Sequence, residues 1–79
     1  MPVEVRVFAT LRPYLPELGI GEAKIMDVPP GTTFDQLREM LGLPADEVKV
    51  IMRNGLQVEP EDVVQDGDRI AYIPAAGGG

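Results

Sequence analysis

The chain has 79 residues, with 13 acidic and 7 basic side chains and a net charge of −6. It contains no cysteine, histidine or tryptophan, which excludes disulfides, thiol nucleophiles, imidazole bases and Cys/His zinc sites. The acidic balance argues against binding to nucleic acid or to anionic lipid, because both need a positive protein surface. The length predicts one domain, and the 44% apolar content is typical of a globular protein.

The N-terminus predicts the cellular compartment. Its first residues, Met-Pro-Val-Glu, lack the charged and apolar blocks of a signal peptide. No apolar run approaches the roughly 20 residues that are needed to span a bilayer. We therefore expect a cytoplasmic protein that does not contact a membrane.

The first third of the chain predicts two strands in a loose hairpin. Residues 3–9 place Val3, Val5 and Val7 on one side, the alternation of a half-buried strand. The connection that follows contains two prolines, which limit any helix there. Residues 22–28 predict a second strand, which ends at a Pro-Pro-Gly turn.

The clearest element is a helix of about ten residues after Thr33. Thr33 and Gln36 have the spacing of a capping box. Phe34, Leu37 and Leu41 then share one helical face. A helix this short needs a sheet to pack on.

The second half predicts three more strands. Residues 48–53 alternate again, Asn54-Gly55 is a hairpin signal leading into residues 56–58, and residues 69–73 form the last strand. The order strand, strand, helix, strand, short strand, strand predicts an α+β fold. We expect the ubiquitin-like β-grasp layout, with a mixed four-to-five-stranded sheet and one main helix packed across one face.

The alternation also predicts which residues each face of the sheet carries. The core should contain Val5, Val7, Phe34, Leu37, Val50, Ile70 and Tyr72. The opposite face should show Arg6, Phe8, Lys49, Ile51, Arg53, Arg69 and Ile73. Apolar side chains grouped among basic ones mark a contact surface, so we predict that Phe8, Ile51 and Ile73 bind a partner within a ring of Arg6, Arg53 and Arg69. The alternative is that loops or strand twist cover Phe8 and Ile51 and leave only single exposed residues.

An acidic run in the last third is a weaker candidate for a site. It comprises Glu59, Glu61, Asp62, Asp66 and Asp68. The run lacks the remaining ligands of a calcium loop, so we predict no metal site and interpret it as a solvated turn.

Three glycines, Gly77, Gly78 and Gly79, end the sequence. We predict a domain over residues 1–73 and a flexible tail over residues 74–79. The simplest interpretation is a frayed end, since terminal residues are often disordered. The functional alternative is that a chain without Cβ atoms enters a narrow slot in a partner, which the six tail residues reach over at most about 20 Å.

Several segments together resemble the MoaD/ThiS family of sulfur carriers. They are the stretch from Val5 to Arg12, the Pro-Pro-Gly-Thr-Thr sequence before the helix, the Asn54-Gly55 hairpin, and the stretch from Asp66 to Pro74 with the glycines that follow. The resemblance covers essentially the whole chain. The length, the longer first connection and the Ile-Pro-Ala-Ala sequence favour the molybdopterin branch of the family, whereas a Gly-Gly-Gly end is closer to some thiamine carriers.

The resemblance implies a function that resides in the tail. The Gly79 carboxylate would be adenylated by an E1-like enzyme that uses ATP, and then converted to a thiocarboxylate. Ala75, Ala76, Gly77 and Gly78 would carry it into a larger synthase subunit or another acceptor enzyme. The chain would be a cosubstrate and the small non-catalytic subunit of a heteromeric synthase, with no permanently bound cofactor.

Two other functions remain open at this stage. The chain could be a ubiquitin-like modifier that forms isopeptide bonds with lysines of target proteins. It could also be a β-grasp interaction domain that binds through its sheet face and does not use its tail. The receiving pathway and the oligomeric state are not predicted from the sequence.

Overall fold

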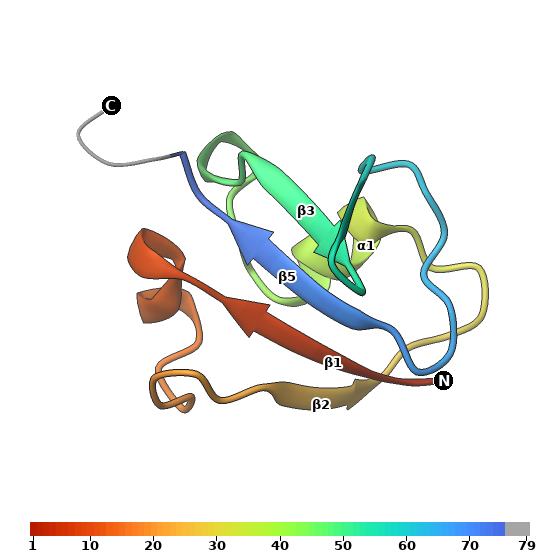
Figure 1. The fold of residues 1–79 in the computed structure, drawn as a ribbon, viewed down its shortest axis with the longest axis horizontal. Coiled ribbons are helices and arrows are strands. Elements are labelled where there is room, and N and C mark those ends of the chain that lie inside the picture. The colour runs from red at the N-terminus through yellow and green to blue at the C-terminus, as the bar shows by residue number, and fades with distance from the viewer. Residues whose placement is uncertain (76–79) are drawn as a thin grey trace.

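The computed structural model describes residues 1–75, which form one sheet, one α-helix and two short 3₁₀ helices. In chain order the elements are β1 (Pro2–Val7), η1 (Ala9–Tyr14), β2 (Lys24–Asp27), α1 (Phe34–Met40), η2 (Ala45–Glu47), β3 (Val50–Arg53), β4 (Leu56–Val58) and β5 (Arg69–Ile73). The sheet order is β2-β1-β5-β3-β4. Only β1 and β5 run parallel, so the sheet is mixed, and α1 packs on one side of it (Figure 1). The predicted ubiquitin-like β-grasp fold is confirmed.

Helix α1 begins where its capping residues predict. The Thr33 hydroxyl accepts a hydrogen bond from the Gln36 amide at 3.1 Å, and the Gln36 side chain accepts one from the Thr33 amide at 2.9 Å. The helix has seven residues rather than about ten. It ends early because Gly42 adopts a left-handed φ of +73°, which turns the chain away from the helix axis.

The core lies between α1 and the covered face of the sheet. Phe34 and Leu37 of the helix pack fully buried over Val5 and Tyr72 of the central strands. The Tyr72 hydroxyl donates to the Phe34 carbonyl oxygen at 2.6 Å, so this buried polar group has a partner. Burial raises the pKa of Tyr72 well above its usual value. The core also includes residues that the strand and helix patterns did not single out, namely Leu11, Leu15, Leu43 and Val64.

Strand β3 faces the opposite way from the prediction. Ile51 is only 5% exposed and lies opposite Tyr72 of β5 on the covered face. Val50, predicted to be in the core, lies opposite Ile73 on the other face and is half-buried. The prediction was wrong because Val50, Ile51 and Met52 are all apolar. Periodicity alone therefore does not decide which alternate residues of β3 point toward the core.

Arg53 is a third residue of β3 that the sequence assigned to the wrong face. It lies opposite Ile70, on the covered face of the sheet, and its guanidinium carbon is 5.4 Å from the centre of the Phe34 ring. Its Nε donates to Asp68 Oδ2 at 3.0 Å. Asp68 is only 4% exposed, so the interpretation of the acidic run as a solvated turn fails at this residue.

The direction of β3 has a measurable consequence for stability. We expect Ile51→Ala to lower the free energy of unfolding by about 2 kcal/mol, because it deletes buried methyl groups and leaves a cavity. Val50→Ala, on the other face of the same strand, should cost clearly less. Urea unfolding of both variants measures the difference, and a larger loss for Val50→Ala would contradict the observed direction.

Candidate functional site

The predicted tail leaves the sheet at the end of β5, between η1 and the start of β3 (Figure 1). The Lys49 amide donates to the Ile73 carbonyl oxygen at 2.8 Å, so β5 stays paired up to its last residue. Pro74 is buried and Ala75 is exposed. Ala76, Gly77, Gly78 and Gly79 lie outside the described residues, and the division between domain and tail stays a prediction.

Phe8 lies beside this exit because β1 and β5 are parallel. Val7, the last residue of β1, is in register with Tyr72, so Phe8 follows β1 at the same edge of the sheet where Ile73 ends β5. The chain then turns sharply into η1 through Ala9, which has a φ of +49°. A positive φ is rare for a residue with a Cβ. This turn leaves the Phe8 side chain 42% exposed.

The face of the sheet opposite α1 carries a hollow of about 290 Å³ next to the exit. We call this side the open face; it includes Phe8 and the outward-pointing residues of the three strands that line the hollow. The side chains that line the hollow include Arg6, Phe8, Met52, Arg69, Ala71 and Ile73. The open face therefore presents an apolar floor with an arginine from each of two neighbouring strands.

The structure brings together four of the six residues that were predicted to bind a partner. Phe8, Ile73, Arg6 and Arg69 line one hollow. Ile51 and Arg53 do not belong to it, because both lie on the covered face. Met52 lines the hollow instead, and Val50 lies on the same face: they are opposite Ala71 and Ile73 in the ladder. The pairing register of β3 with β5 is the signal that identifies them, and single-strand periodicity does not contain it.

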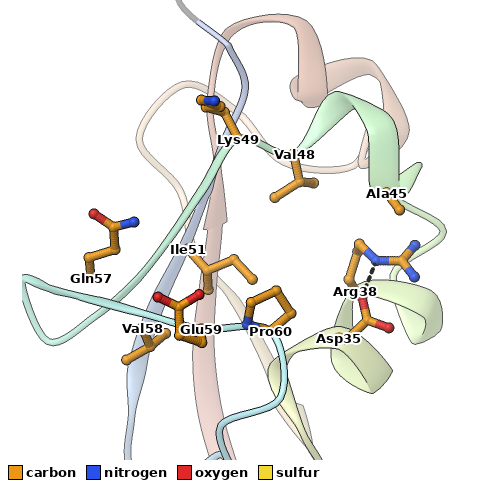
Figure 2. Close-up of a pocket in the computed structure, with 10 residues that line it drawn as sticks. All are labelled: Asp35, Arg38, Ala45, Val48, Lys49, Ile51, Gln57, Val58, Glu59 and Pro60. Atoms are coloured by element: carbon orange, nitrogen blue, oxygen red, sulfur yellow. Dashed lines mark hydrogen bonds and ion pairs between the residues drawn. The ribbon is translucent and has the colours of Figure 1, made fainter.

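Ile51 and Lys49 instead line a second cavity, of about 180 Å³, between α1 and the β3–β4 hairpin. Figure 2 shows the Ile51 side chain directed into this cavity, with Asp35 and Arg38 of the helix on the other side. The Arg38 Nε donates to Asp35 Oδ1 at 2.9 Å, which lowers the pKa of the Asp35 carboxyl. Only two of the four basic residues that were predicted on the open face, Arg6 and Arg69, are therefore found there.

The described residues offer little catalytic chemistry of their own. Within residues 1–75, no group of three or more acidic, histidine or cysteine side chains is placed to hold a metal ion. The Tyr14 hydroxyl donates to the Glu47 carboxylate, which raises the pKa of Tyr14 and ties η1 to η2. In the same part of the chain, no helix is both long and apolar enough to cross a membrane. The candidate site is a hollow on the open face, next to the point where the chain leaves the sheet.

Comparisons with known proteins agree with this class of fold. SAMP1 from Haloferax volcanii is 19% identical, with 100% of both chains covered and a TM-score of 0.73. A putative molybdopterin converting factor subunit 1 from Pyrococcus furiosus is 21% identical, over 92% of this chain and 95% of that one, with a TM-score of 0.71. Subunits 1 and 2 of the molybdopterin-converting factor from Helicobacter pylori 26695 form a complex, and the matching chain is 23% identical over 100% of both chains, with a TM-score of 0.58. A search of curated proteins found no significant match.

The fold defines a ubiquitin-like β-grasp domain. The model of the ThiS family matches residues 5–79. The chain therefore belongs to the ThiS family of ThiS/MoaD-type sulfur carriers, and the family resemblance seen in the sequence is confirmed.

Proposed function

We propose that the chain carries sulfur on the carboxylate of Gly79. The observation that supports this most is that the family match extends to Gly79 and includes all three glycines. An E1-like enzyme would join the carboxylate to AMP from ATP and release pyrophosphate. Hydrosulfide would then displace AMP from the acyl carbon and leave a thiocarboxylate, AMP and a proton.

The geometry supports a division of labour between body and tail. The chain is paired in the sheet up to Ile73, Pro74 is buried, and the five residues beyond Pro74 reach at most about 17 Å. A partner that binds the open face beside Phe8 and Ile73 therefore fixes the origin from which the tail extends. The activating enzyme and the acceptor enzyme would use this surface in turn, and both would supply the catalytic groups.

Intact mass spectrometry tests this function. Incubation of the chain with its E1-like enzyme, ATP and sulfide should raise its mass by about 16 Da, because one oxygen is replaced by sulfur. The gain should need ATP and should map to the C-terminal peptide. No gain with an enzyme that forms AMP from ATP in the presence of this chain would contradict the proposal.

We assign the sulfur to molybdopterin synthesis, where the chain would be the small subunit of a synthase. This assignment rests on the sequence resemblance given above. The chain that carries the thiocarboxylate should then form a complex with a larger synthase subunit and lose its added sulfur to a molybdopterin precursor. Transfer to a thiamine precursor instead would place the chain in the other branch of the family.

A second candidate function is protein modification. The fold is similar to that of SAMP1, which is described as a small archaeal modifier protein. This function requires isopeptide-linked adducts that form in cells and disappear when Gly78 and Gly79 are deleted. Adducts that also form without the E1-like enzyme would contradict this second function.

A further inference from the structure

Arg69 occupies a central position on the open face. It is the first residue of β5, in register with Glu4 of β1, and its side chain is exposed. The Arg69 amide donates to the Asn54 side chain at 2.9 Å, which ties this end of β5 to the β3–β4 turn. The backbone that carries the guanidinium is therefore fixed before any partner arrives.

Two hollows of similar size meet at Arg69. One, of about 290 Å³, is the hollow described above, with Phe8, Met52 and Ile73 beside the chain exit. The other, also about 290 Å³, lies toward the far end of the strands, and its lining includes Pro2, Glu4 and Ile25. Ile25 is 63% exposed. Arg69 lines both hollows, so a positive group lies between two depressions that each carry apolar residues.

The charge of Arg69 is not neutralised within the described part of the chain. Glu4, which is in register with Arg69, has its Oε2 at 3.6 Å from Arg6 Nη1, and among residues 1–75 no ion pair involves Arg69. Asp27, at the edge of the same face, lies 3.8 Å from the ammonium of Met1. The open face thus presents an uncompensated positive charge on a protein whose net charge is −6.

We propose that Arg69 determines which protein binds the open face, by pairing with a carboxylate that the partner presents between two apolar side chains. The apolar side chains would fill the two hollows, and the guanidinium would bind the carboxylate with two parallel hydrogen bonds. Arginine at the centre of an interface, where neighbouring contacts exclude water, is a frequent hot spot. This inference rests on the proposed function, because the partner is the E1-like enzyme that adenylates the Gly79 carboxylate.

The dissociation constant of that enzyme for the uncharged chain tests the inference. We expect Arg69→Gln to raise it about 10- to 100-fold at low salt, and Arg69→Glu to raise it further by adding repulsion. Arg69→Leu should bind as weakly as Arg69→Gln, because a larger apolar surface does not replace the charge. The difference between wild type and Arg69→Gln should shrink as salt is raised toward 1 M.

Lys24→Gln is the matched control, since it removes one positive charge from a residue that lies on the covered face of β2 and pairs with Glu17 at 3.2 Å. It should change the dissociation constant less than twofold. An Arg69→Gln or Arg69→Leu variant that binds like wild type overturns the role of Arg69 and leaves sulfur carriage intact, provided that the wild-type chain is still charged. If the wild-type chain does not form the thiocarboxylate, the proposed function itself is overturned, and the role of Arg69 with it.

Discussion

Deletion of Gly79 should reduce the rate of thiocarboxylate formation by about 100-fold or more. The shortened chain still ends in Gly77-Gly78, so no side chain is introduced into the partner's slot. Its terminal carboxylate is withdrawn by one residue, or about 3.5 Å, while the sheet still holds the chain at Ile73. Reacting atoms that are displaced by even about 1 Å can lose about 100-fold in rate. Single-turnover kinetics of thiocarboxylate formation, followed by intact mass spectrometry, measure the two rates.

Two further variants distinguish the effect of tail length from the effect of a side chain in the tail. Gly79→Ala keeps the length and adds one Cβ, so it reports on the width of the slot. Ala75→Gly keeps the length and changes only the exposed residue next to Pro74, and it should charge at nearly the wild-type rate. If the chain that lacks Gly79 charges as fast as wild type, the enzyme recognises any Gly-Gly end and the distance from the sheet is not fixed.

The body of the domain could be predicted from local signals wherever those signals agreed. The Thr33–Gln36 capping box, the alternation of Val3, Val5 and Val7, and the Asn54-Gly55 turn all predicted the elements that the structure contains. Each is decided by neighbours in the sequence, and the glycine and asparagine of the turn both have the positive φ that a tight hairpin requires.

The surface could be predicted only in part, because its composition depends on strand pairing. Phe8 and Ile73 were found because β1 and β5 each have one clearly apolar side. Strand β3 has apolar residues on both sides, and only its register with β5 places Ile51 inward and Met52 outward. Contacts between distant residues settle the direction of such a strand.

The burial of Asp68 also depends on strand pairing and could not be predicted from the local sequence. In the sequence it is the second acid of an Asp-Gly-Asp turn, and such turns are usually solvated. In the structure the turn is hydrogen-bonded to the β3–β4 turn through Asn54 and Asp68. The Asp68 carbonyl oxygen also accepts a hydrogen bond from the Glu4 amide at 2.9 Å. The pairing of β3 with β5 brings Arg53 and Asn54 to the Asp68 carboxylate, and no local pattern encodes this pairing.

Asp68→Ala should therefore be among the most destabilising substitutions in the chain. The carboxylate accepts from Arg53 Nε at 3.0 Å, from the Gln65 amide at 2.7 Å and from Asn54 Nδ2 at 3.3 Å. Its removal leaves the half-buried Arg53 guanidinium without its counter-charge and the Gln65 amide without its acceptor. We expect a loss of about 3 to 4 kcal/mol, against a total stability of roughly 4 to 12 kcal/mol for a domain of this size.

Asp66→Ala is the matched control, because Asp66 lies two residues away in the same turn, is exposed, and should change the free energy of unfolding by less than about 0.5 kcal/mol. Urea unfolding compares the two variants directly. Asp68→Asn keeps one carbonyl acceptor and the side-chain volume but removes the charge, so its loss should be intermediate. Equal stability of the Asp68→Ala and Asp66→Ala variants would show that Arg53 finds another acceptor, and that the turn does not depend on this carboxylate. Because the turn leads directly into β5, whose far end holds Pro74, its rigidity also sets how firmly the origin of the tail is held.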